Sequence, residues 1–275
     1  MSEAPSRSVP DNPARVRTSP GVTTAWLAVG SIAAVLGLVF GVVQVVGLLA
    51  HEERTEVVTI SDPAIAVLDV GSDAGRIEIV GADVTEVRIT ARVSDGLTAT
   101  DFRHRVVGDR LEVRVRCNGL VGGPWCRAGL RILVPRGLEV RVRSDSDRVI
   151  VRGITGRVDA ASGDGSVEAE GLSGAVILHS SNGEVRASRL RASSIQANSD
   201  NGSVRLEFDR AAESTIAKSA NGNVEISVPR DGKGYAIDLS SGNGSTDNQV
   251  QTDSTSARRI VASSENGNVT VRYLD

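Results

Sequence analysis

Aromatic residues, cysteine and histidine are scarce in this chain of 275 residues, which has 3% aromatics, two cysteines and three histidines. So few aromatics argue against a protein that binds sugars or bases by stacking. The net charge of -3 excludes the strongly basic domain that is typical of nucleic-acid-binding proteins. A hydrophobic content of 40% excludes a wholly disordered chain. We therefore expect one or two domains with a sizeable core.

Charged residues are also absent between Arg17 and His51, and residues 24–50 form an almost continuous apolar run. At about 1.5 Å per residue, such a run is long enough to cross a hydrocarbon core of about 30 Å, so it predicts a transmembrane helix. A cleaved signal peptide is the alternative. Its apolar region is shorter, about 7–15 residues, and ends in a small-residue cleavage site. This run ends in Leu48-Leu49-Ala50, which is a poor site.

The flanking charges predict the orientation of this segment. Arg7, Arg15 and Arg17 precede it, whereas Arg54 is the only basic residue close behind it. Basic residues favour the cytoplasmic side, so we expect a cytoplasmic N-terminus and an extracytoplasmic C-terminal domain in a single-pass protein of the cell membrane. The proline-containing residues 1–23 are predicted to be a disordered tail.

Small residues recur at four-residue spacing within the predicted helix, at Ala33, Gly37 and Gly41. Such a stripe lets two membrane helices approach closely, which predicts a dimer face. The alternative is that glycine and alanine are simply common in membrane helices. Both interpretations stay open.

Internal repeats fill the rest of the chain. Six turns can be aligned on a glycine, and four of them read Ser-x-Asn-Gly-x-Val, with single departures in the other two. The aligned glycines are Gly165, Gly183, Gly202, Gly222, Gly244 and Gly267. A serine lies three residues before each of them, at Ser162, Ser180, Ser199, Ser219, Ser241 and Ser264. Two further copies surround Asp147 and Gly75, and apolar residues recur at alternate positions on both sides of most turns.

This alternation predicts two short strands in each copy, each with one buried face. The step between consecutive copies from residue 138 onward is 18–23 residues, which is too short for a crossover helix. One strand pair cannot bury its own apolar face, so successive copies must stack. We predict an all-β fold, a β-solenoid or a closely related sheet of stacked hairpins. We expect the turn glycines to supply positive backbone dihedrals and the serines to turn inward and bond the turn backbone.

The predicted domain boundaries follow from these patterns. Residues 51–60 would be a juxtamembrane linker, and residues 138–275 the regular repeats. Residues 61–137 would hold the first repeat and an irregular hairpin block that caps the membrane-proximal end. Cys117 and Cys126 bracket a glycine-rich loop in that block, which favours a disulfide outside the cytoplasm. A metal-binding pair is the alternative, although two sulfurs without a nearby histidine or carboxylate make a poor zinc site.

An N-terminal membrane helix followed by Ser-x-Asn-Gly-x-Val repeats resembles the family of membrane-anchored β-repeat proteins known as adhesins, and the toast-rack modules of bacterial envelope-stress proteins. The resemblance covers residues 57–275. It implies an extracytoplasmic protein of the bacterial envelope with a β-helix-like fold, and it offers no catalytic residues.

Arginine is unevenly distributed, with 13 arginines against 7 acidic residues between positions 100 and 160. Those in the first regular repeats are Arg141, Arg143, Arg148, Arg152 and Arg157. They predict a basic patch for a cell-wall polymer or anionic lipid. The alternative is a solvated rim in an arginine-rich chain. The last repeat ends without a polar cap, so we also predict that the C-terminal coil docks another copy or another envelope protein.

No motif for catalysis, phosphate binding or metal binding accompanies the repeats. The three histidines lack partners at ligand spacing, and Asp164 and Asp200 are too isolated for a typical calcium loop. We therefore predict no cofactor and a non-enzymatic interaction or scaffold module, acting in adhesion or in sensing envelope stress. The alternative is a carbohydrate-binding or carbohydrate-active solenoid, which would place clustered carboxylates on one outward face.

Overall fold

The computed structural model describes residues 34, 37, 38, 40, 41, 52–73, 75–95, 100–117 and 127–274. The chain divides into two units, residues 1–49 and 50–275. The described residues of the first unit are helical, and no helix within the described residues is long and apolar enough to cross a membrane. Most of the predicted span 24–50, including Ala33, lies outside the described residues, as does the tail 1–23. The membrane helix, its orientation and its dimer face stay predictions.

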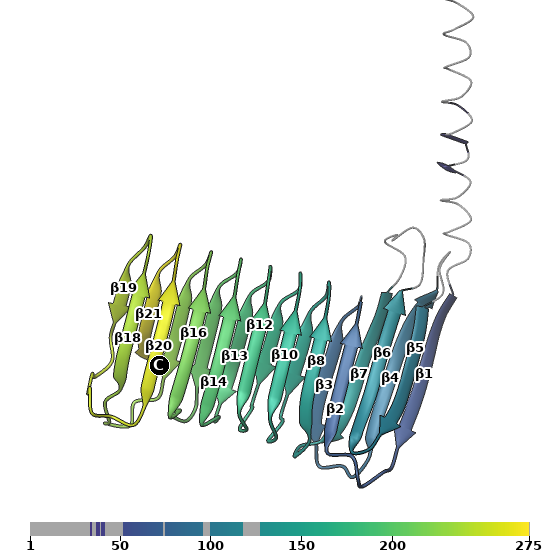
Figure 1. Ribbon diagram of the computed structural model, residues 1–275, viewed down its shortest axis with the longest axis horizontal. Coiled ribbons are helices and arrows are strands. Elements are labelled where there is room, and N and C mark those ends of the chain that lie inside the picture. Colours follow the sequence, from purple (N-terminus) through teal and green to yellow (C-terminus); the bar gives the residue numbers. More distant parts are fainter. Residues whose placement is uncertain are drawn as a thin grey trace, which may run out of the picture. The chain divides into compact units, whose positions relative to one another are not determined.

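The second unit consists of two β-sheets that enclose a narrow core (Figure 1). The eleven strands of sheet A are, in spatial order, β1 (Glu52–Ile60), β4 (Val87–Asp95), β7 (Arg127–Pro135), β3 (Ile77–Ala82), β9 (Val149–Arg152), β11 (Val167–Glu170), β13 (Val185–Leu190), β15 (Val204–Phe208), β17 (Val224–Val228), β21 (Val269–Tyr273) and β19 (Thr246–Asn248). The ten strands of sheet B are β18 (Ala236–Ser241), β20 (Arg259–Ser264), β16 (Ser214–Ser219), β14 (Ser194–Ser199), β12 (Val176–Ser180), β10 (Val158–Ser162), β8 (Glu139–Ser144), β2 (Val67–Ser72), β6 (Arg110–Cys117) and β5 (Thr100–Val107).

Each sequence repeat forms one coil, which is a strand of sheet B, a tight turn and a strand of sheet A. Neighbouring coils pair in parallel and in register, so that Val158 pairs with both Val140 and Val176. The two strands of one coil lie in different sheets, so the stacked-hairpin alternative is wrong and the all-β repeat stack is confirmed. Parallel stacking explains the near-identical copies, because equivalent residues must superpose in every coil.

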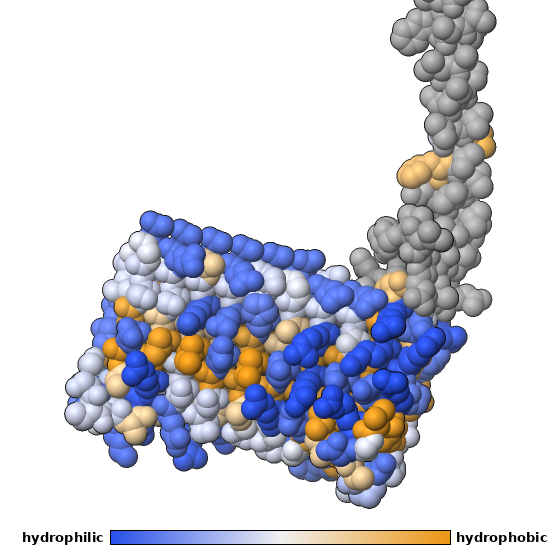
Figure 2. All heavy atoms as spheres, viewed as in Figure 1, coloured by the Kyte–Doolittle hydropathy of each residue, from blue (hydrophilic) through white to orange (hydrophobic). Residues whose placement is uncertain are grey.

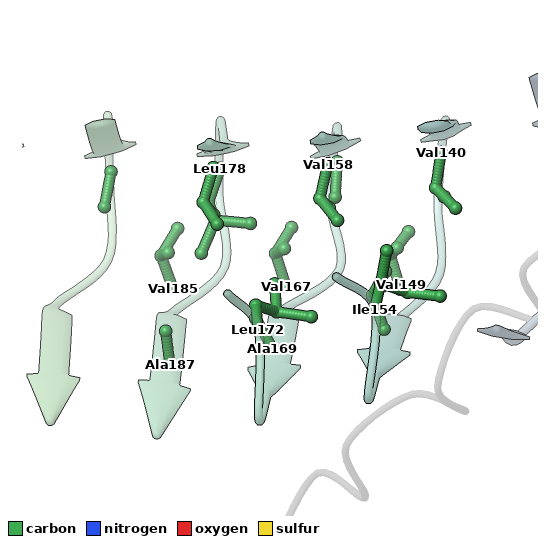
Figure 3. Packing of buried hydrophobic residues seen from close by; sticks show 14 of the residues in the cluster. Val140, Val149, Ile154, Val158, Val167, Ala169, Leu172, Leu178, Val185 and Ala187 are labelled. Carbon is green, nitrogen blue, oxygen red and sulfur yellow. The ribbon is translucent and has the colours of Figure 1, made fainter. Parts of the chain in front are cut away.

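The core is filled by the inward rows of aliphatic residues from both sheets (Figure 3). Figure 3 also shows Ile154 and Leu172, which lie in the connections from sheet A back to sheet B and are fully buried. They close the core on the side opposite the tight turns. The alternation that predicted the strands did not identify them, because they lie outside the strands, although both follow the first inward valine of the preceding strand by five residues. A fully buried Leu or Ile contributes about 1.5–3 kcal/mol to stability, so these connections matter to the stack.

The turn glycines are required by close approach and not, as we expected, by positive dihedrals. The glycines with positive φ among the described residues are Gly75, Gly108, Gly153, Gly171 and Gly232, none of which belongs to the six aligned turns. A Cβ atom on Gly183 would lie 2.3 Å from the carbonyl oxygen of Gly165 in the neighbouring coil. The same clash recurs along the row, so any side chain at this position would push the coils apart.

The turn serines point inward and join consecutive coils. The Ser180 hydroxyl donates to the Gly165 carbonyl oxygen at 2.8 Å and accepts from the Gly183 amide at 2.8 Å. The donated bond recurs at Ser162, Ser199, Ser219, Ser241 and Ser264. We call this row of serines the serine ladder. At each step it gives a turn carbonyl oxygen a hydrogen-bond donor, because buried backbone groups need a partner.

The last coil in the sequence is not the last coil in space. Coil β20–β21 lies between β16–β17 and β18–β19, so β18–β19 ends the stack. The prediction that the C-terminal coil forms the open end is therefore wrong. Residues 236–248 form that end instead, with Ile237 and Leu239 only half-buried.

A similar inversion occurs at the other end of the stack. Strands β6 and β7 come later in the sequence than β2 and β3, but their coil lies farther toward this end of the stack and pairs in parallel with β2 and β3. The block predicted as an irregular hairpin therefore contributes a further coil. Antiparallel strands follow on both sheets, β4 and β1 on sheet A and β5 on sheet B. Residues 52–60, expected as a linker, are thus the edge strand β1. Cys126 lies outside the described residues, so the disulfide with Cys117 stays a prediction.

Candidate interaction surface

The five arginines of the predicted patch lie on two opposite faces. Arg141 and Arg143 project from the outer side of β8 in sheet B, and Arg157 lines the same hollow on that face. Arg148 and Arg152 belong instead to the outer side of sheet A, where they pair with Glu168 and Glu170. The two strands of each coil belong to opposite sheets. Arginines that follow one another in the sequence are therefore divided between two surfaces. The prediction of a single patch is therefore wrong. The part of it that lies on sheet B consists of Arg141, Arg143 and Arg157.

Arginines from strands outside the regular repeats join that part. The antiparallel pair β5–β6 lies beyond β2 at the same end of sheet B. We call the following set the arginine surface: Arg103, Arg105, Arg110, Arg114, Arg116, Arg141, Arg143 and Arg157. Figure 2 shows strongly hydrophilic side chains gathered over this end of the stack. The charge excess between residues 100 and 160 was the signal for it, but the sequence did not reveal that β6 and β8 both neighbour β2.

Carboxylates lie beneath these guanidinium groups and balance much of their charge. Arg105 pairs with Glu112 at 2.7 Å, with side-chain exposures of 72% and 17%. Arg103 and Asp101 are 79% and 24% exposed, and Arg143 and Asp159 are 61% and 27% exposed. In each pair the arginine is the outer partner. The surface therefore presents guanidinium donors to solvent although its net charge is small.

Two of these arginines are held in place by their neighbours. The Arg141 guanidinium bonds Glu139, and this hydrogen bond and the carboxylate charge raise the pKa of Arg141 above its ordinary value. Arg114 donates to Asp69 at 3.1 Å and lies across Gly71. A Cβ atom on Gly71 would be 3.2 Å from the Arg114 side chain, so glycine leaves room for it.

The middle of the same face is different in character. Ile177, Ile216 and Val261 occupy one outward row across β12, β16 and β20, with Gln196 of β14 between them. The three aliphatic side chains are half-buried, whereas Gln196 is exposed, and Figure 2 shows an apolar band across the centre of this face. Charged groups on sheet B are thus concentrated at the β5–β8 end.

The outer face of sheet A carries carboxylates, which the carbohydrate-active alternative would need in a cluster. Glu225 bonds Arg272 at 2.7 Å and Arg205 at 3.4 Å. Glu170 bonds Arg152 and Arg189 in the same manner. These carboxylates are therefore engaged with arginines of adjacent strands, and none of these contacts brings two of them together as an acid–base pair.

The remaining candidate ligands are dispersed. His104 lies on β5 with its ring 5.9 Å from that of Phe102, His179 lies on the outer side of β12, and His51 falls outside the described residues. Over the part of the chain that the structure describes, no three His, Cys, Asp or Glu side chains come together as a metal site.

A protein-family model matches most of the chain. The family model Toastrack DUF4097 matches residues 38–273. The chain belongs to this family. The family resemblance inferred from the Ser-x-Asn-Gly-x-Val repeats is thereby confirmed, and the chain is a Toastrack β-repeat protein.

Solved structures matched to this Toastrack chain have low identity. One is a "putative cell adhesion protein" from Clostridium sporogenes, with 11% identity, a TM-score of 0.41 and coverage of 81% of this chain and 100% of the other. Another is a "putative adhesin" from Bacteroides fragilis, with 15% identity, a TM-score of 0.40 and coverage of 81% and 97%. A "putative adhesin" from Parabacteroides merdae has 11% identity, a TM-score of 0.33 and coverage of 82% and 97%. None of the curated proteins matches the chain.

Proposed function

We propose that this Toastrack protein is a non-enzymatic interaction or scaffold module of the bacterial cell envelope. Its N-terminal segment 24–50 anchors it as a single-pass membrane protein, with the N-terminus in the cytoplasm and the β-stack outside. The uncharged run and its basic N-terminal flank support this topology. The role is adhesive or part of sensing envelope stress.

The arginine surface is the part of the module that binds, and its ligand is an anionic polymer of the cell wall. The observation that supports this is the layering of the ion pairs, with exposed guanidinium groups over less exposed carboxylates. Arginine presents a planar fork of donors that matches phosphate and carboxylate groups. The paired carboxylates hold the forks in position, which lowers the entropy cost of binding.

Catalysis is not part of this proposal. Glu170 and Glu225 on the outer face of sheet A are bonded to arginines, and the turn serines donate to turn carbonyls in the stack. A general acid or a nucleophile would have to be released from these structural bonds first.

Sedimentation of the full chain with purified cell-wall sacculi, at low and at high salt, tests the proposal. Because screening shortens electrostatic range to about 10 Å at 0.1 M salt, binding through exposed arginines must weaken as salt rises. A parallel arm uses anionic and neutral vesicles. Salt-sensitive cosedimentation with sacculi supports the proposal. Failure to bind sacculi overturns it. The anchor inserts into both kinds of vesicle, so in that case a salt-sensitive excess of binding to anionic over neutral vesicles assigns the surface to lipid head groups.

A further inference from the structure

A ladder of side-chain amides runs along the turns, one position before the turn glycines. The carboxamide nitrogen of each asparagine donates to the side-chain oxygen of the equivalent residue in the neighbouring coil, at 2.7–2.9 Å. The donor–acceptor steps are Asn182 to Asp164, Asn201 to Asn182, Asn221 to Asn201, Asn266 to Asn221, and Asn243 to Asn266. Figure 2 shows a continuous hydrophilic line along this edge of the stack.

Each of these asparagines precedes a glycine, and Asn–Gly is the dipeptide in which asparagine most readily loses its side-chain amide. The glycine nitrogen attacks the side-chain carbonyl carbon, a C–N bond forms in a five-membered succinimide, and ammonia leaves. Water then opens the ring to aspartate or isoaspartate. Glycine favours the attack because no side chain shields its nitrogen. Another such pair, Asn118–Gly119, lies outside the described residues.

The ladder restrains four of its asparagines at both ends of the carboxamide. In Asn182, Asn201, Asn221 and Asn266 the nitrogen donates and the oxygen accepts, so the side chain must break two hydrogen bonds before it can rotate toward the backbone. Asn243 donates to Asn266, and its own oxygen accepts from no described residue. It is held by one such bond because β18–β19 is the last coil in the stack.

The glycine after Asn243 is also the most accessible. Gly244 is exposed, whereas Gly183, Gly202, Gly222 and Gly267 are half-buried between coils. The base that takes up the proton of the attacking nitrogen therefore reaches Gly244 from solvent. A weaker restraint on the side chain and an open backbone nitrogen coincide at this one turn of the ladder.

We propose that Asn243 is the spontaneous deamidation site of the asparagine ladder. The product carries one additional negative charge at the open end of the stack. It also has no amide hydrogen to donate, so the last bond of the ladder, to Asn266, is lost. The modification therefore loosens the coil that terminates the stack.

Tryptic peptide mapping of the full chain during incubation in mildly alkaline buffer tests this directly. The five asparagines fall on five different tryptic peptides, Val158–Arg186, Ala192–Arg205, Ser219–Arg230, Gly234–Arg258 and Ile260–Arg272. The amide-to-acid mass shift of each can be followed in one sample. The matched control is the same chain unfolded in guanidinium at the same pH, where the ladder is absent.

One additional hydrogen bond protects by a factor of about two to ten, so Asn243 should convert faster than each other ladder asparagine by that factor in the folded chain. In the unfolded chain the five rates should become similar. The proposal is overturned if a ladder asparagine other than Asn243 converts at the same or a higher rate in the folded chain. It is equally overturned if the advantage of Asn243 persists unchanged on unfolding, since its local sequence would then be the cause.

Discussion

The Ser264 hydroxyl donates a hydrogen bond of 2.8 Å to the carbonyl oxygen of Gly222, which lies 42 residues earlier in the chain. In consecutive coils the same bond spans 15 to 17 residues. The longer span shows that the chain places coil β18–β19 outside, then returns to insert β20–β21 beneath it. The serine ladder is continuous through the inversion, because every coil offers the same donor and acceptor.

Two deletions test whether the coils stack in this inverted order or in the order of the sequence. Removing residues 231–255 joins Arg230 to Ser256 and leaves a connection of five residues between β17 and β20, equal in length to residues 209–213 between β15 and β16. We expect this variant to fold with β20–β21 stacked on β16–β17, since their pairing is unchanged. Hydrogen exchange should show protected amides in β20 and β21.

The matched truncation removes residues 259–275 and should be more damaging. Coil β18–β19 would lose the neighbour against which both of its strands pair, so its amides should exchange freely. Equal protection of β18 in this variant and in the full chain would contradict the inverted order.

Substitution of a turn glycine should separate two coils. In G183A the new methyl group would lie 2.3 Å from the Gly165 carbonyl oxygen, so we expect the free energy of unfolding to fall by about 2–3 kcal/mol. The control is G129A on β7, where nothing lies within 4 Å, and the change should stay within about 0.5 kcal/mol. Chemical denaturation measures both. Similar losses in the two variants would show that close approach is not the reason for glycine in the turns.

Loss of a ladder serine should cost more within the stack than at its end. Ser180 is fully buried and makes two hydrogen bonds, so S180A should lower the free energy of unfolding by about 1–3 kcal/mol. Ser241 is half-buried in the terminal coil, where water can replace the lost hydroxyl, so S241A should cost less than about 1 kcal/mol. If S241A proved as costly as S180A, the terminal coil would not be open to solvent.

Alkaline pH should destabilise the region around Tyr235. Burial, together with the charge of Asp231, raises the pKa of the Tyr235 hydroxyl above its ordinary value of about 10. The folded state then holds this proton more tightly than the unfolded state. The stability it contributes is complete below pH of about 10 and is lost as pH rises through the folded-state pKa. Denaturation across this range should show the stability difference between the wild type and Y235F decreasing, whereas a constant difference would contradict the assigned shift.

The strand alternation and the spacing of the turns predict the repeat stack well, because each inward residue repeats in every coil. The inverted coil order was harder to predict, because the spacing of the repeats does not by itself determine whether β16 pairs with β18 or with β20. One signal was present: Thr246 and Asn248 of β19 occupy inward positions that hold Val269 and Val271 in β21. Polar residues suit a coil with one side in water, and the valines need cover on both sides.

The interaction surface was predictable only in part. The local excess of arginine pointed to residues 100–160, but sequence order alone cannot assign each side chain to a face. Arg148 and Arg143 are five positions apart and project from opposite sheets, whereas Arg114 and Arg143 flank Gly71 in neighbouring strands of sheet B. The pairing of β2 with both β6 and β8 creates this proximity, and it depends on the inversion at that end of the stack.

The most direct test of the proposed envelope-binding role compares two sets of substitutions on opposite faces. The first, R103Q/R105Q/R143Q, removes three exposed arginines from the arginine surface. The second, R186Q/R189Q/R272Q, removes three paired arginines from the outer face of sheet A. Sedimentation of each full-length variant with cell-wall sacculi at low salt gives the comparison. The account predicts that the first set abolishes binding and the second leaves it close to wild type. Equal binding by both variants would contradict it.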